Sequence, residues 1–205
     1  MRFLAVIGAL AIVLAAMMTS FFFGGFFDVS ATYDDPSIVS SALTKVREAS
    51  IARRATLTSP IPLDRQDTIQ QGARQFAQHG CANCHGAPGV NWAKFSEGLH
   101  PDPPDLKEVV DHRTPAQLFW VIKNGINMTG MPSFALAGAK DDEIWSVVAF
   151  LKKLPSIKDA EYKAWTAPPP PPAPPAPPPA AAPPPAAEPP AATPPAPPAP
   201  PAESK

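Results

Sequence analysis

The chain has 205 residues, of which 31 are proline and only two are cysteine, and its formal net charge is −1. Because this charge is close to neutral, we expect no nucleic-acid partner. Two cysteines three positions apart cannot staple an extracellular fold, so their pattern favours a chemical role for Cys81 and Cys84.

The N-terminal segment is predicted to be a membrane anchor. Residues 3–27 carry no charge and consist largely of Leu, Ile, Val, Ala, Met and Phe. About 20 apolar residues cross the hydrocarbon layer as a helix. Ala15-Ala16-Met17 fits a cleavage site poorly, so we expect residues 1–27 to be retained as an anchor. A cleaved signal peptide and a buried core helix are the alternatives.

The charges beside this segment predict its orientation. Arg2 precedes it, whereas Asp28, Asp34 and Asp35 follow it. The positive-inside rule then places the N-terminus in the cytoplasm and the rest of the chain beyond the membrane.

Residues 28–66 are predicted to be a helical stalk. Pro36 suits the first turn of a helix over residues 36–54, and Pro60 and Pro62 break the chain after it. Apolar residues recur at helical spacing within that range, at Ile38, Ala42, Leu43, Val46 and Ala49.

Residues 67–166 are predicted to be the packed domain. Asp67 is the expected N-cap of its first helix, which ends near Gly80. The sequence Thr114-Pro115-Ala116-Gln117 combines a hydroxyl cap, a proline at the first helical position and a capping-box glutamine. It therefore predicts a second helix, which ends at Gly125.

The last helix of this domain is predicted from three consecutive acidic residues, 141–143, which suit a first turn. Pro155 ends it. Because the sequence shows no strand pattern, we expect an all-α domain.

Residues 167–205 are predicted to be a disordered tail. Of the 31 prolines, 21 lie between Pro168 and Pro201, and most of the remaining tail is alanine. Such a segment has too little apolar surface to build a core and favours extended polyproline II structure. We expect a passive spacer; a docking ligand is the alternative.

The pentapeptide Cys81-Ala82-Asn83-Cys84-His85 is the strongest motif in the chain. Two thiols at this spacing can add to the two vinyl groups of one haem, and the adjacent His85 then lies beneath the iron as an axial ligand. A thioredoxin-like redox pair, half of a zinc site and two merely buried or disulfide-linked cysteines are the alternatives.

A sixth ligand to the iron is predicted in the loop before the last helix. Met131 lies 46 residues after His85, between Gly130 and Pro132, which suit a fixed loop close to the haem. A thioether favours Fe(II) and raises the reduction potential. Met128 is the second candidate, and two histidines, His100 and His112, are further alternatives.

These motifs together resemble a class I cytochrome c over residues 72–154. The sequences IKNGINMTGMPSF and DDEIWSVVAFLKKLP are similar to those of membrane-anchored monohaem cytochromes of proteobacteria, including small c-type subunits of terminal oxidases. The resemblance implies that the first and last helices of the domain cross, with Gly72 and Phe76 meeting Trp145 and Phe150. It also implies a carbonyl that accepts a hydrogen bond from His85, supplied by Pro103 or Pro104, and a haem contact by Leu106.

The expected function is single-electron transfer by one haem c. With His85 and Met131 both bound, the iron has no open position for oxygen or peroxide chemistry, so we expect a carrier and not an enzyme. The haem domain is expected in the periplasm, anchored by one span in the bacterial inner membrane.

Its partners are expected to be a quinol-oxidising complex and a terminal oxidase. A haem subunit fixed to a periplasmic dehydrogenase or oxidase is the alternative, and an enzyme or gas sensor with a labile methionine is a third hypothesis.

Overall fold

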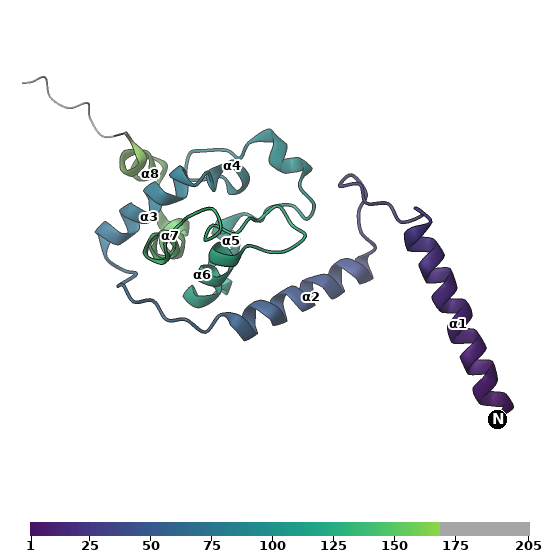
Figure 1. Ribbon diagram of the computed structural model, residues 1–205. Coiled ribbons are helices and arrows are strands. Elements are labelled where there is room, and N and C mark those ends of the chain that lie inside the picture. Colours follow the sequence, from purple (N-terminus) through teal and green to yellow (C-terminus); the bar gives the residue numbers. More distant parts are fainter. Residues whose placement is uncertain (169–205) are drawn as a thin grey trace, which may run out of the picture. The chain divides into compact units, whose positions relative to one another are not determined.

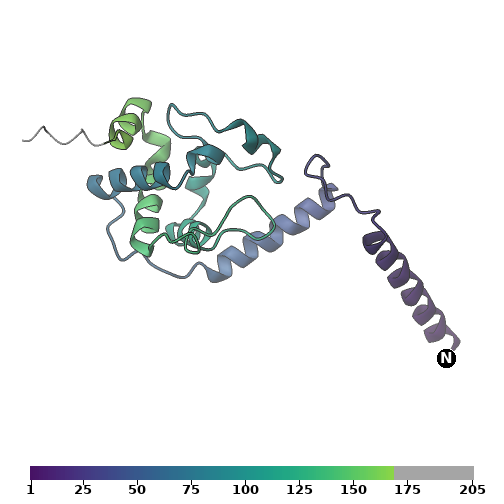
Figure 2. The same cartoon turned by 45° about the horizontal axis from the view of Figure 1, so that its top comes forward.

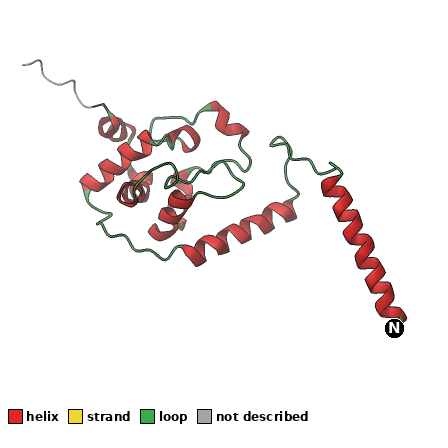
Figure 3. Ribbon diagram, in the orientation of Figure 1, coloured by secondary structure: helices red, strands yellow, loops and turns green. Residues whose placement is uncertain are grey.

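The computed structural model describes residues 1–168, which form helices joined by loops (Figures 1 and 3). These residues contain no strand, only an isolated bridge between Ala87 and Val90, so the predicted all-α class is confirmed. The predicted Pro/Ala-rich tail lies outside the described residues from residue 169 onward. The helices are α1 (Arg2–Phe23), α2 (Ser37–Arg54), α3 (Gln66–Gln78), α4 (Ala82–His85), η1 (Lys94–Gly98), α5 (Leu106–Val109), η2 (Val110–His112), α6 (Pro115–Asn124), α7 (Asp141–Lys153), η3 (Leu154–Ser156) and α8 (Asp159–Thr166).

Helix α1 has the length and composition of a membrane span. It has 22 residues, and none of its side chains is buried in the described part of the chain. A helix that is apolar on every side is unfavourable in water and suits a lipid environment. This helix supports the predicted membrane anchor.

The centre of the domain is the crossing of α3 and α7, which both views of the ribbon show (Figures 1 and 2). A methyl group on Gly72 would lie 1.9 Å from the carbonyl oxygen of Ser146 and 2.9 Å from Cβ of Phe150. Only glycine therefore fits at this contact. One turn further on, the rings of Phe76 and Phe150 lie 5.2 Å apart, and both are fully buried.

Helix α6 completes the core beside α7 and begins and ends as its sequence predicts. Thr114 Oγ1 accepts a hydrogen bond from the Gln117 backbone N–H at 3.2 Å, and Gln117 accepts one from the Thr114 N–H at 3.0 Å. Gly125 follows its last residue with a φ of 69°. The ring of Phe119 stacks on that of Trp145 at 4.1 Å, so Trp145 packs against α6.

The start of α3 differs from the prediction. Arg65, not Asp67, is its N-cap, and the helix begins at Gln66. Asp67 lies in the first turn, where its carboxylate accepts hydrogen bonds from the Arg65 guanidinium, at 3.0 Å from Nε, and from the Thr68 N–H at 2.9 Å. The Asp67 carboxylate is thus paired with Arg65 within the first turn and does not cap the helix.

The sequence predicts no helix after Pro155, yet α8 follows. The backbone N–H of Lys158 donates to Glu161 at 2.9 Å, which helps to start this helix after the interruption. Tyr162 is buried with its ring 5.7 Å from that of Phe150, and α8 packs against α3.

Helix α2 packs against the domain. Its Ile51 is only 2% exposed, and α2 lies against α6. The two carboxylate oxygens of Glu48 accept hydrogen bonds from both terminal nitrogens of Arg113, with 2.7 Å between Nη2 and Oε1. The segment predicted to be a stalk thus contacts the domain through Glu48 and Ile51.

We predict that Gly72→Ala destabilises the protein by roughly 1–3 kcal/mol, because an added methyl group must push α3 away from α7. Guanidinium unfolding of the purified protein measures this loss. Gly98→Ala is the matched control, since nothing lies within 4 Å of a methyl group there. Equal unfolding midpoints for the two variants would show that the crossing tolerates the methyl group.

We predict a pH-dependent effect of Glu48→Gln. Hydrogen bonds from Arg113 hold the pKa of the Glu48 carboxyl below its ordinary value of 4.5. Its contribution to stability is therefore present above that ordinary value and is lost as the pH falls through the folded-state pKa. Thermal unfolding should show the variant about 1 kcal/mol less stable at neutral pH, with the difference vanishing in acid. A difference that does not change with pH would contradict this pairing.

Candidate haem site

Cys81, Cys84 and His85 share one helical turn. The chain leaves α3 through Gly80, with a φ of 72°, and the Cys81 N–H donates to the Phe76 carbonyl at 3.1 Å. The His85 N–H then donates to the Cys81 carbonyl at 3.0 Å. This bond closes a turn of α-helix, so the Cys81 and His85 side chains leave the same face. Both cysteines are free and partly buried.

The His85 ring is held by a backbone carbonyl. Nδ1 lies 2.9 Å from the Pro104 oxygen, and because a carbonyl only accepts, Nδ1 carries the proton. The sequence left Pro103 and Pro104 open, and the structure selects Pro104. With Nδ1 engaged, Nε2 is left with its lone pair free for a metal ion.

The pKa of His85 is lowered by burial, which outweighs the opposing effects of the Pro104 carbonyl and the Asp105 carboxylate. The imidazole is therefore neutral at neutral pH. Neutral imidazole is the form that binds a metal ion.

The environment of Cys81 separates the rival interpretations of the two cysteines. Burial raises the pKa of the Cys81 thiol to about 12, so it is not a thiolate at neutral pH. A redox pair needs a lowered thiol pKa, which is the opposite of what burial does to Cys81. A neutral thioether suits this burial better.

The surroundings of the motif argue the same way. Within residues 1–168 no three His, Cys, Asp or Glu side chains are grouped so that they could hold a metal ion. A helix precedes Cys81, whereas a thioredoxin-like pair follows a strand.

The loop that contains Met131 has a fixed backbone. The Ile126 N–H donates to the Met131 carbonyl at 3.1 Å. Thr129 Oγ1 donates to the Ile126 carbonyl at 2.8 Å and accepts from the Met131 N–H at 3.2 Å. A methyl group on Gly125 would lie 2.8 Å from the Met131 oxygen, so this loop closes tightly on the end of α6.

The two methionines of this loop differ in exposure. Met131 is partly buried and packs against the hydrophobic core, as do Cys81 and Leu106. Met128 is 90% exposed and has a φ of 58°, so its side chain leaves the protein. This difference favours Met131 as the haem ligand.

The two further histidines face another side chain or solvent. His100 Nε2 is 3.9 Å from an Asp35 carboxylate oxygen, in the segment before α2, and His112 is exposed at the end of η2. These positions leave Met131 as the better candidate.

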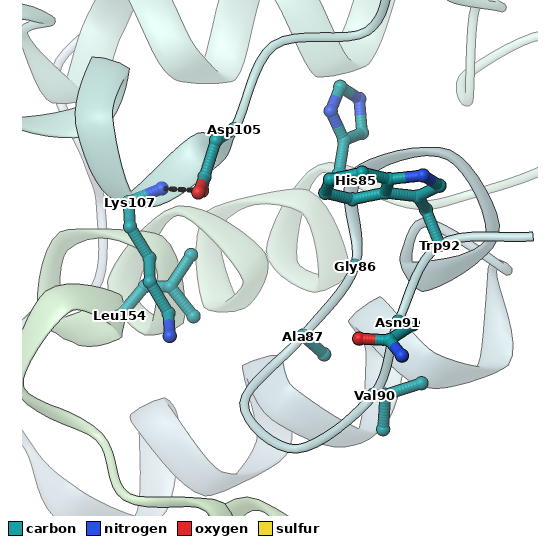
Figure 4. A pocket seen from close by; sticks show the side chains of 9 residues that line it. All are labelled: His85, Gly86, Ala87, Val90, Asn91, Trp92, Asp105, Lys107 and Leu154. Atoms are coloured by element: carbon teal, nitrogen blue, oxygen red, sulfur yellow. Dashed lines mark hydrogen bonds between the residues drawn. The ribbon is translucent and has the colours of Figure 1, made fainter. Parts of the chain in front are cut away.

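Residues 86–99 contribute features that sequence reasoning missed. A methyl group on Gly130 would lie 2.9 Å from Cδ1 of Leu99, so the methionine loop and this segment touch. A pocket of about 130 Å³ lies next to His85. Figure 4 shows that the His85 ring points away from Ala87, Val90 and Asn91. Trp92 lines the same pocket and is half exposed. No short motif marks the contact of Leu99 with Gly130, because it joins two loops that are far apart in the sequence.

These residues fit a covalently attached haem. Cys81 and Cys84 would form the two thioethers, and His85 and Met131 would be the axial ligands. When bound, haem supplies an iron that cycles between Fe(III) and Fe(II). The chain itself orients the His85 ring and packs apolar side chains around the site.

Comparison with known proteins supports this assignment. Residues 67–151 match the family model described as cytochrome C oxidase, cbb3-type, subunit III. The match runs from the start of α3 almost to the end of α7 and includes both cysteines, His85 and Met131. No curated protein and no solved structure matches the chain.

We predict that Met131→Ala keeps covalently bound haem, loses the weak sulfur-to-iron absorption band of the ferric protein and lowers the reduction potential, because water or no ligand replaces the thioether. Met128→Ala is the matched control in the same loop and should change neither property. Absorbance spectra and a redox titration measure both. Loss of the band only in Met128→Ala would show that Met128, and not Met131, is the ligand.

Proposed function

We propose that this chain, whose residues 67–151 match the cbb3-type subunit III family model, is a membrane-anchored c-type cytochrome that transfers single electrons through one haem. The haem is attached at Cys81 and Cys84 and ligated by His85 and Met131. The observation that carries this proposal is the family match over a segment in which a neutral His85 ring is held by the Pro104 carbonyl.

The arrangement favours electron transfer over catalysis. With His85 and Met131 both holding the iron, neither oxygen nor peroxide would have a place to bind. The Pro104 bond and the Thr129 bonds keep His85 and the methionine loop in place, which limits reorganisation when the charge of the site changes.

We place this haem domain on the periplasmic face of a bacterial inner membrane, in a respiratory chain. The charge asymmetry around α1 supports this orientation, with Arg2 before the span and three aspartates after it. A quinol-oxidising complex would be the donor and a terminal oxidase the acceptor. Because residues 67–155 carry eight basic and nine acidic side chains, encounters should depend little on long-range steering.

A second candidate function is that of a haem subunit fixed to an oxidase or dehydrogenase. The family match supports it, since that family is named for an oxidase subunit. Purification from native membranes in mild detergent distinguishes the two functions. A stoichiometric catalytic partner selects the fixed subunit, and the cytochrome alone selects the carrier.

We predict that a potentiometric titration of the purified protein follows a one-electron Nernst curve and that the reduced protein does not bind carbon monoxide. The physical reason is that His85 and Met131 would both hold the iron and leave no place for carbon monoxide. Met131→Ala should bind carbon monoxide readily and serves as the positive control. Rapid binding by the unaltered reduced protein would instead support a gas sensor or an enzyme.

A further inference from the structure

Helix α2 has two distinct faces. At 3.6 residues per turn, Glu48 and Ile51 fall on the side that packs against the domain. An apolar stripe, which we define as Ile38, Val39, Ala42, Leu43, Val46 and Ala49, falls on the opposite side.

The apolar stripe is unpartnered in the described chain. Ile38 is 79% exposed, Leu43 58% and Val46 67%, and the two alanines are exposed as well. Branched apolar side chains recurring over three turns of a surface helix indicate an interaction site, because soluble domains seldom expose such a stripe. The helix gains its contact with the domain from its other face, so the stripe is not needed to hold α2 in place.

Basic side chains accompany the stripe. Helix α2 contains four of them and a single acidic residue, Glu48, which Arg113 already pairs on the domain side. Lys45, Arg53 and Arg54 are exposed. The outward side of α2 is therefore apolar and positively charged, with no carboxylate to oppose the charge. An apolar stripe with long cationic side chains is suited to a bilayer surface that carries anionic headgroups.

The membrane is also within reach. Residues 24–36 connect the end of α1 at Phe23 to the start of α2 at Ser37. Even fully extended, these 13 residues span at most roughly 45 Å. A helix tethered so closely to a membrane span meets the lipid surface at high effective concentration, which favours lipid over a soluble partner.

We propose that α2 lies on the surface of the anchoring membrane, with its apolar stripe in the headgroup region and its basic side chains on anionic lipids. Its opposite face holds the haem domain through Ile51 and the Glu48–Arg113 pair. Helix α2 then contacts the membrane with one face and the domain with the other, which holds the domain close to the membrane, where its partners lie. The proposal depends on α1 as an anchor but not on the identity of the haem ligands.

The test uses the full-length haem-loaded protein in nanodiscs of phosphatidylcholine with phosphatidylglycerol. Val46→Cys places one nitroxide label on the stripe, and Thr44→Cys places it on the other side of the same helix, where Thr44 is also exposed. Since haem attachment consumes Cys81 and Cys84, the new cysteine is the only free thiol. Power-saturation spectroscopy compares the accessibility of each label to oxygen, which enters lipid, and to a water-soluble nickel complex.

The label at position 46 should be several-fold more accessible to oxygen than to nickel in these nanodiscs, and the label at position 44 should show the reverse. Nanodiscs of phosphatidylcholine alone, or high salt, should weaken the difference. Equal nickel accessibility at both positions overturns the proposal. So does protection of position 46 that appears only after membrane proteins are added, which would assign the stripe to a protein partner. The haem spectrum of each sample reports separately on the proposed function.

Discussion

The short helical turn that carries Cys81, Cys84 and His85 is the constraint on which the rest of the structure depends. Two sulfur atoms and an imidazole must face one side, and the imidazole must be both neutral and fixed. Burial favours the neutral imidazole by lowering the pKa of His85. The carbonyl of Pro104 fixes the ring by accepting a hydrogen bond from Nδ1 at 2.9 Å. The core formed by α3, α6 and α7 supports this turn, since the Cys81 N–H donates to the carbonyl of Phe76, a core residue of α3.

Much of the fold followed from local signals in the sequence. The Thr114 capping box, the Gly125 stop and the acidic first turn of α7 all act within a few residues, and each lies where the structure has it. The start of α3 was wrong because an acidic residue such as Asp67 is favourable within the first turn as well as at the cap, so its presence does not fix the first residue. Helix α8 was missed because what stabilises it is long-range packing of Tyr162 against Phe150, which local sequence patterns do not reveal.

Some features of the candidate site are likewise visible in short motifs, whereas others depend on contacts between distant parts of the chain. The pentapeptide and the methionine loop are short motifs, and the sequence identified them directly. The choice between Pro103 and Pro104 depends on which carbonyl reaches Nδ1, and the contact of Leu99 with Gly130 depends on how two loops meet. Neither is encoded by spacing. Only one face of α2 could be predicted. Its apolar periodicity is visible in the sequence, but its contact with Arg113 is not.

We infer that two thioether bonds join one haem to this chain. Intact mass spectrometry of the denatured, acid-treated protein is the decisive measurement, because non-covalent haem is lost under those conditions. We expect a single species whose mass is that of the chain plus one haem, with no thiol left to alkylate at Cys81 or Cys84. The mass of the bare chain, with both thiols reactive, would contradict it.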